Sequence, residues 1–150
     1  MNTTAALYGL LSGDAALVAM LASYTPKGGA TVVAIFDEEP PDGFIFSEGN
    51  ARPCLVIDPP RRDAPDATLT ERFRVVEQNV RLYAHRGTSN VAIDAAARRV
   101  RDLIHQRHEA LTITGGRAIA ASVAGPTQAP TSDRAVTGRL LTISLELQET

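Results

Sequence analysis

The chain has 150 residues, of which 44% are hydrophobic, and its 15 basic and 17 acidic residues give a formal net charge of −2. This length suits one domain that buries enough apolar surface to fold without disulfide or metal cross-links. The balanced charge argues against a general nucleic-acid binder or a membrane-surface protein, and the single cysteine, Cys54, makes an internal disulfide impossible. Met1–Ala6 carries no basic residue and no apolar run has the length of a bilayer span, so we expect no signal peptide and a cytosolic protein at synthesis.

Two short helices are predicted near the N-terminus. Leucine and other apolar residues recur at helical spacing from Leu7 to Tyr24. Ser12, Gly13 and Asp14 interrupt this pattern. The Asp14 carboxylate can accept hydrogen bonds from free N–H groups in the first turn of a helix, so we expect it to be the N-cap of the second helix.

Two compact runs, Thr31–Phe36 and Cys54–Asp58, predict strands because β-branched or apolar residues fill them and turn residues bound them. Three polar segments predict long loops: an acidic loop at 37–52, a proline-rich loop at Asp58–Thr70, and a loop at Gly125–Thr137. All nine prolines lie outside the periodic segments, which agrees with hydrogen-bonded structure in those segments.

The middle of the chain predicts a strand followed by a long helix. Alternate residues of Val76–Ala84 are apolar except for Gln78, as expected of a strand with one buried face. Upstream apolar residues have the opposite parity, so we expect a bulge or bend near Val75 and Val76. From Ile93 to Ile104 the spacing of apolar residues changes to three and four, which predicts one helical stripe lying across that buried face.

The remaining strands are predicted from alternation. Leu111 and Ile113 indicate a strand that ends in a hairpin turn at Gly115–Gly116, and Arg117–Ala124 indicates another. Leu141–Gln148 alternates so regularly that one face should lie on the core and the other on water or a partner. The elements together predict a single α+β domain over residues 1–150: a largely antiparallel sheet with a long helix packed on one face, two short N-terminal helices and long polar loops.

No combination of residues is typical of a catalytic, cofactor-binding or metal-binding site. His105 and His108 are three positions apart, but without a nearby cysteine or the zincin spacing they fit a solvated helix end better. His85 lies on the non-core parity of its strand and has no nucleophile motif around it. Cys54 is most simply a small buried hydrophobe, and Gly28–Gly29 do not precede a helix as a phosphate-binding loop would. We therefore predict no enzyme, no cofactor and no metal.

Charged residues on the predicted long helix form a lateral strip of Asp94, Arg98, Arg101 and His105. Arg98 has an acidic residue four positions before it and another, Asp102, four positions after it, so two ion pairs are expected. Such pairs are common and weak on solvated helix faces. The strip therefore fits either a solvated surface or a binding surface for an acidic partner.

The acidic loop 37–52 has the composition of such a partner. It combines acidic residues with Phe44, Ile45 and Phe46, which a solvated loop has no reason to display. Contact between this loop and the arginine strip of an identical neighbour would be head-to-tail, and such contacts close into rings when the rotation allows. The predicted subunit interface therefore consists of Asp37, Glu38, Glu39, Asp42, Phe44, Phe46, Arg98 and Arg101.

The pattern of nearly the whole chain resembles a known family. The residues that carry the resemblance are the N-terminal helices with Leu7, Leu10, Leu11, Asp14, Leu17 and Leu21, the strands Pro53–Ile57 and Val80–Tyr83, the helix Ala96–His105, and Leu111–Gly116. In this order they are similar to the tail-completion or tail-terminator family of long-tailed bacteriophages, which has versions in prophages and gene transfer agents. The chain departs from the usual pattern in its proline-rich insertion Pro59–Thr68 and its extended acidic loop.

The resemblance implies a structural virion protein without catalytic residues. Such a protein forms a hexameric ring that caps the finished tail tube, stops its growth and offers the surface to which the filled head attaches. The implied partners are further copies of the chain, the tail tube protein and the head–tail connector or stopper protein, with no membrane contact and no specific binding of nucleic acid. The implied location is the neck of the virion, reached by assembly in the host cytoplasm.

Other functions remain open from the sequence. A head-side connector or adaptor of the same neck region would need the same kind of scaffold. A small metal-binding domain or enzyme would use His85, His105 and His108. A nucleic-acid-binding module would use Arg61, Arg62, Arg98, Arg99 and Arg101.

Overall fold

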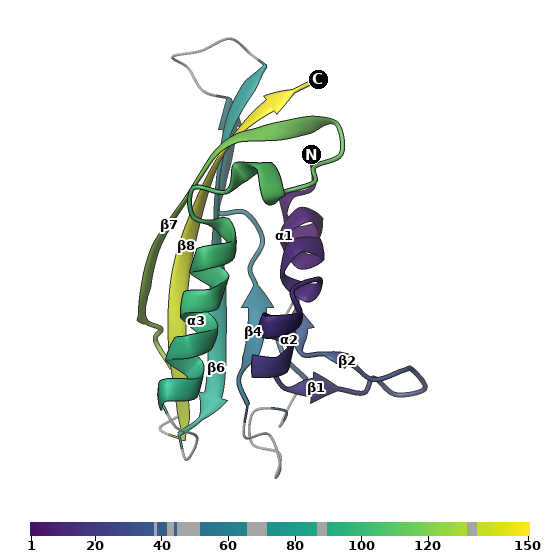
Figure 1. Ribbon diagram of the computed structural model, residues 1–150, viewed down its shortest axis with the longest axis vertical. Coiled ribbons are helices and arrows are strands. Elements are labelled where there is room, and N and C mark those ends of the chain that lie inside the picture. Colours follow the sequence, from purple (N-terminus) through teal and green to yellow (C-terminus); the bar gives the residue numbers. More distant parts are fainter. Residues whose placement is uncertain (38, 42–43, 45–51, 66–71, 87–89, 132–134) are drawn as a thin grey trace.

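The computed structural model describes residues 1–37, 39–41, 44, 52–65, 72–86, 90–131 and 135–150. Two long antiparallel strands, β6 (Phe73–His85) and β8 (Val136–Glu149), form its centre (Figure 1). The main sheet has six strands in the order β3 (Ile35–Phe36), β4 (Cys54–Ile57), β6, β8, β7 (Gly116–Gln128), and β5 (Arg62–Pro65) also pairs with β6. β3 and β4 run parallel, whereas the pairs of β6 with β4, β5 and β8, and of β7 with β8, are antiparallel. The predicted α+β class with a largely antiparallel sheet is confirmed.

The helices α1 (Thr3–Ser12), α2 (Ala15–Met20) and α3 (Asn90–Ile104) cover one face of this sheet, and a short 3-10 helix, η2 (His108–Ala110), follows α3 (Figure 1). The two N-terminal helices and the helical stripe are as predicted. None of the described helices combines the length and apolar character needed to cross a bilayer. The stripe of α3 packs into a core shared with α1, α2 and the sheet, and its buried residues are Ile93, Ala96, Ala97, Val100, Leu103 and Ile104.

Gln78, the polar residue on the buried face of β6, is fully buried and joins three segments. Its side-chain oxygen accepts a hydrogen bond from the Thr3 hydroxyl at 2.8 Å. Its amide nitrogen donates to Thr4 Oγ1 and to the Asp58 carbonyl, each at 2.7 Å. Since Thr3 and Thr4 lie at the start of α1 and Asp58 follows β4, one side-chain amide connects α1, β6 and the end of β4.

Asp14 caps α2, as predicted, and also binds α3. Its Oδ2 accepts a hydrogen bond from the Leu17 N–H at 2.8 Å. Arg99 of α3 donates from Nε to Oδ2 at 2.9 Å and from Nη2 to Oδ1 at 2.7 Å. These bonds from Arg99 are the main reason why the pKa of Asp14 lies below its ordinary value, and burial of the carboxyl opposes them.

The lowered pKa of Asp14 predicts a loss of stability in acid. Because folding lowers this pKa, the ionised carboxylate stabilises the folded chain above the ordinary aspartate pKa, and the contribution disappears as the pH falls through the folded-state value. Asp14→Asn should keep the cap, since asparagine is also a good N-cap, but lose the charge. Thermal melts over roughly pH 2 to 6 should therefore show a flatter profile for this variant than for the native chain.

Two further variants sharpen this test. Asp14→Ala removes the cap as well and should cost about 1 kcal/mol more than Asp14→Asn. Glu146→Gln removes an exposed carboxylate of β8 and should leave the acid profile unchanged. Parallel profiles for the native chain and Asp14→Asn would contradict the prediction.

The predicted bulge near Val75 and Val76 is wrong. β6 pairs with β8 in one unbroken register along its whole length. Phe73 and Val75 have the opposite parity because they face the other side of the sheet, where they are half-buried. The pairing is interrupted instead on the other side of β6, where β4 and β5 both pair with it. Pro59 and Pro60 separate these two strands, and proline cannot donate a ladder hydrogen bond.

The proline-rich loop predicted at Asp58–Thr70 contains β5, so this part of the prediction is wrong. The sequence of β5 shows no apolar alternation. Instead, ion pairs with β6 hold this segment on the sheet. Arg61 contacts Glu77 at 3.1 Å, and Asp63 accepts a hydrogen bond from Arg74 at 2.8 Å. A strand held by charged neighbours is polar on both sides, and for this reason it has the composition of a loop.

The prediction also differs from the structure around β7. Leu111 and Ile113 are buried in the core, but their segment forms no described strand, so the predicted strand and hairpin are wrong. Their alternation reflects burial in an extended segment without sheet pairing. β7 continues beyond the predicted end at Ala124, across an irregularity that accommodates Gly125 and Pro126. The loop predicted at this point is correspondingly shorter.

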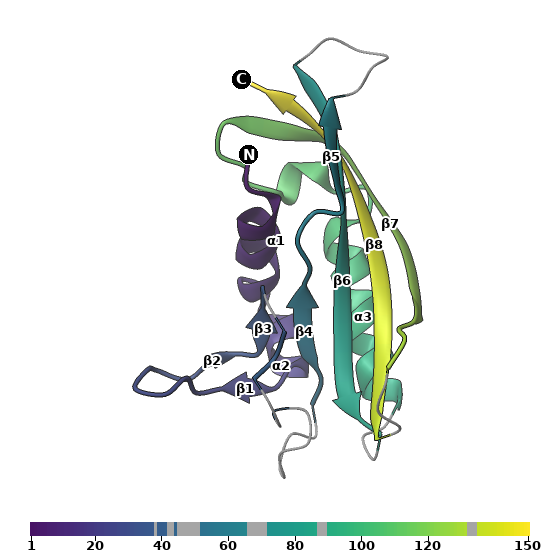
Figure 2. The same cartoon turned by 180° about the vertical axis from the view of Figure 1, so that it is seen from behind.

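The strand predicted at Thr31–Phe36 is divided between two sheets. Its second half, β3, joins the main sheet, whereas β2 (Val32–Val33) pairs with β1 (Ser23–Tyr24) in a separate two-stranded sheet. We call residues Ser23–Val33 the arm. The arm projects away from the body of the molecule in both views (Figures 1 and 2).

Candidate interaction surfaces

Glu39, the first described acidic residue after Asp37, binds Arg81 of β6. The Arg81 guanidinium donates to both oxygens of Asp58 at 2.6–3.0 Å, to Glu39 Oε1 at 2.7 Å and to the Tyr83 hydroxyl at 2.7 Å. Partial burial alone would lower the pKa of Arg81, but its hydrogen bonds with Asp58, Glu39 and Tyr83 outweigh that effect and raise it. Glu39, a predicted interface residue, is thus paired within the chain, although 74% of its side chain is exposed. Its role between subunits stays a prediction.

Phe44, another predicted interface residue, packs against two aromatic rings of its own chain. Its ring centroid lies 5.5 Å from that of Tyr24 and 5.4 Å from that of Phe36, both edge-on, and the latter two rings are 5.3 Å apart. This three-ring cluster joins the base of the arm to β3 and lies on the small core around Cys54. Three further predicted interface residues lie outside the described part of the chain: Glu38, Asp42 and Phe46.

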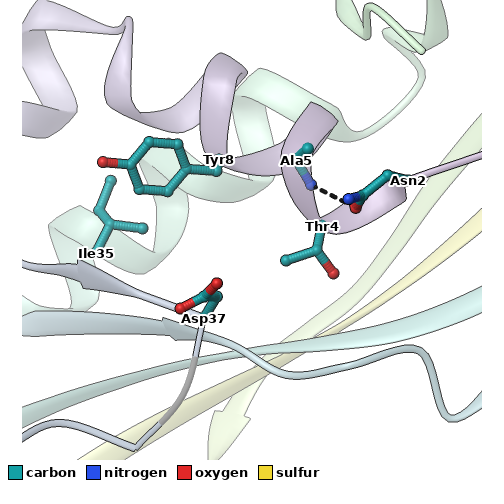
Figure 3. Close-up of a pocket in the computed structure, with 6 residues that line it drawn as sticks. All are labelled: Asn2, Thr4, Ala5, Tyr8, Ile35 and Asp37. Atoms are coloured by element: carbon teal, nitrogen blue, oxygen red, sulfur yellow. Dashed lines mark hydrogen bonds between the residues drawn. The ribbon is translucent and has the colours of Figure 1, made fainter. Parts of the chain in front are cut away.

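Asp37 lines an open pocket of about 480 Å³ between α1 and β3 (Figure 3). We call this the Asp37 pocket; its lining residues are Asn2, Thr4, Ala5, Tyr8, Ile35 and Asp37. Asn2 is already engaged as the N-cap of α1, where its side chain accepts a hydrogen bond from the Ala5 N–H at 2.9 Å. Asp37 makes no hydrogen bond or ion pair with any residue that the structure describes.

The predicted charge strip on α3 is largely engaged within the chain. Asp94 accepts a hydrogen bond from Arg139 of β8 at 2.7 Å and does not pair with Arg98. Arg101 Nη1 donates to the backbone carbonyls of Val123 and Gly125 at 2.6 and 2.7 Å. Arg98 is exposed and forms neither of its predicted ion pairs within the described residues. Of the two arginines predicted at the interface, Arg98 is therefore the one whose guanidinium has no partner in the part of the chain that the structure describes.

The outer edge of β7 is capped by the end of α3 and the residues that follow it. In addition to the two bonds from Arg101, the Gln106 N–H donates to the Ala121 carbonyl at 2.9 Å. The Val123 N–H donates to Nδ1 of His105 at 3.0 Å. On an open edge strand these backbone groups would be unpaired and available to another strand. Here Arg101 of α3 and the two residues after the helix, His105 and Gln106, already occupy them.

The residues that were candidates for catalysis or metal binding either have partners within the chain or lie apart from one another. Nδ1 of His105 accepts the bond from β7, and Nδ1 of His108 lies 3.7 Å from the neighbouring Glu109. Cys54 is 2% exposed, and burial raises the pKa of its thiol to about 12, so it is a poor nucleophile at neutral pH. His85 ends β6. Within the described ranges, no three His, Cys, Asp or Glu residues lie close enough together to hold a metal ion.

Four of the five arginines that a nucleic-acid-binding module would use have partners in the chain. Arg61 and Arg62 contact Glu77 at 3.1 and 3.7 Å. Arg99 binds Asp14, and Arg101 binds the backbone of β7, as described above. These side chains are oriented by intramolecular acceptors and are not gathered into one unpartnered basic surface.

Comparison with known proteins gives similarity to solved structures. No protein-family model matches the sequence, and no curated protein matches it. Among solved structures, the chain is similar to one described as "Virion of native gene transfer agent (GTA) particle", with a TM-score of 0.68 and 20% sequence identity. The similarity covers 96% of this chain and 92% of that chain. At this identity it establishes that the two chains share a fold.

Proposed function

We propose that this chain is a structural virion protein of the tail-terminator type. On this proposal it forms a hexameric ring at the head-proximal end of the tail tube, ends tube growth and offers the surface to which the head attaches. It resides in the neck of the virion after assembly in the host cytoplasm. The observation that carries the proposal is the fold shared with a chain of a gene transfer agent virion.

The share of both chains that the similarity covers supports the proposal more strongly than the 20% sequence identity does. Because 96% of this chain and 92% of the other are covered, the shared fold extends over nearly the whole length of both chains. The resemblance of the sequence to the tail-terminator family is a second, independent ground for the proposal. Fold alone does not determine function, so the surfaces must supply the rest of the argument.

The surfaces fit a protein that acts by binding neighbours. Asp37 and Arg98 are charged and lack partners among the described residues, and the arm projects from the body (Figure 2). By contrast, the groups that catalysis would need are occupied: His105 accepts a backbone hydrogen bond and Cys54 is buried. We therefore propose a non-enzymatic protein without a cofactor.

The proposal predicts ring formation and a length-limiting effect on tubes. Size-exclusion chromatography with light scattering should give a mass of six subunits at high protein concentration, and negative-stain electron microscopy should show rings. When the chain is added to the tail tube protein encoded nearest to it, the rings should sit at one end of each tube and tube elongation should stop. Tube length and end occupancy are the measured quantities.

Three control outcomes distinguish the proposed function from the alternatives. Albumin at the same concentration should leave tube growth unchanged. A chain that stays monomeric with and without tubes would contradict the ring. A ring that ignores tube ends but binds the head-side portal assembly would instead identify a head-side connector or adaptor.

A further inference from the structure

The arm ends in a turn that presents Lys27. The Gly29 N–H donates to the Pro26 carbonyl at 2.9 Å and Gly28 has a φ of 77°, which are features of a type II turn with Lys27 at its second position. Gly28 suits this place because other residues rarely adopt a positive φ. A Cβ added to Gly29 would lie only 2.7 Å from Pro26 Cγ. Pro26–Gly29 therefore holds the lysine at the tip of the arm.

The arm carries both unpaired charge and exposed apolar surface. Lys27 is the only lysine of the chain, is exposed, and makes no hydrogen bond or ion pair with any described residue. Val32 is 44% exposed. A hydrogen bond between the Thr25 and Thr31 hydroxyls at 2.7 Å closes the arm behind the turn, and the aromatic cluster anchors its base. A two-stranded hairpin is marginal by itself, so an ordered, projecting one suits a contact with another molecule.

The Asp37 pocket has the complementary properties. Its charged group is the unpartnered Asp37 carboxylate, and the Tyr8 side chain, 39% exposed, provides an aromatic wall (Figure 3). Ile35, which is 6% exposed, is the apolar β3 residue that lines the pocket. An acceptor of this kind suits a narrow element that carries one cation and a few apolar side chains.

We propose that the arm of one copy docks into the Asp37 pocket of a second copy, with the Lys27 ammonium paired to the Asp37 carboxylate. The arm leads away from its own body in both views, so the contact is intermolecular (Figures 1 and 2). The inference rests on the proposed function and deepens it by naming the contact between neighbours in the ring. Because donor and acceptor are different surfaces of one chain, the contact repeats head-to-tail, as ring closure requires.

The single lysine makes this contact directly testable. A water-soluble carbodiimide joins an amine to a carboxylate that touches it, with loss of water and without a spacer. Treated assemblies should yield an isopeptide between Lys27 and Asp37, identified by mass spectrometry of proteolytic fragments. When unlabelled and ¹⁵N-labelled copies are mixed before treatment, half-labelled cross-linked peptides show that the bond joins two copies.

Two matched variants serve as controls. Lys27→Arg keeps the positive charge but cannot form the isopeptide, so it should assemble normally and lose the cross-link. Asp37→Asn should lose the cross-link and assemble less well. The charge-reversal variants Lys27→Asp and Asp37→Lys should each lower the affinity of self-association by about tenfold or more. The double variant should recover most of that affinity. Thermal melts at a protein concentration too low for association should stay unchanged, because neither side chain has a partner among the described residues.

The outcomes distinguish the arm contact from the ring. Rings that form without a Lys27–Asp37 cross-link, or that tolerate both charge reversals, would overturn the arm contact while leaving the proposed function intact. A product that stops at a dimer cross-linked through both arms would support the arm contact and contradict the ring. Chains that never associate, alone or with tubes, would contradict both.

Discussion

Replacement of Gln78 by leucine is expected to lower the free energy of unfolding by about 3 kcal/mol. The substitution removes one hydrogen bond to the Gln78 oxygen and two from its nitrogen, and the side chain is fully buried. The Thr3 hydroxyl and the Asp58 carbonyl would lose their partner in a region where water does not easily replace it. Urea denaturation followed by circular dichroism measures the change.

The effect should be specific to the buried site. Gln128→Leu makes the same substitution at an exposed position near the end of β7 and should change stability by less than about 0.5 kcal/mol. Hydrogen exchange of amides in α1 should rise in Gln78→Leu, because this glutamine joins α1 to the sheet. Equal stabilities of the two variants would show that the buried amide does not stabilise the fold.

Replacement of Arg101 by alanine is expected to destabilise the chain by about 2 kcal/mol. The guanidinium donates to the carbonyls of Val123 and Gly125 at 2.6 and 2.7 Å, and hydrogen bonds from charged donors contribute more than neutral ones. Loss of these bonds should also loosen the outer edge of β7. Amide exchange at Val123, whose N–H donates to His105, should therefore accelerate more than exchange in β6.

Arg98→Ala is the matched control for this prediction. It removes the same side chain from the same helix, but from an exposed position without a partner among the described residues. Its stability and its exchange pattern should remain close to those of the native chain. If the two alanine variants unfold at the same denaturant concentration, the contacts between Arg101 and β7 do not contribute to stability.

Much of the scaffold could be predicted because short-range periodicity reports burial. The alternation in Val76–Ala84 and the stripe from Ile93 to Ile104 both match the buried faces of β6 and α3. Periodicity did not predict the strands correctly where a segment is buried without pairing in a sheet, or pairs in a sheet without being buried. Leu111 and Ile113 are buried without a ladder, and β5 has a ladder without apolar alternation because charged side chains hold it.

The candidate surfaces were less predictable because their partners are distant in sequence. Glu39 pairs with Arg81 of its own chain, a contact separate from its predicted place between subunits, and Asp94 pairs with Arg139 instead of the arginine four positions away. Helical spacing identifies possible pairs on one element but not a competing partner on another. The arm is not among the elements predicted from the sequence, although Pro26–Gly29 between two short apolar runs is a turn signal.

The capped edge of β7 has a consequence for how copies of the chain can be stored before assembly. Sheets that add strands edge to edge have no natural stopping point, and so they grow into fibres. Between Ala121 and Gly125 such growth must first displace Arg101, His105 and Gln106 from the backbone groups they occupy. This stretch of β7 is thus protected against amyloid-like polymerisation even at high protein concentration, and copies of the chain can associate only through other surfaces without that cost.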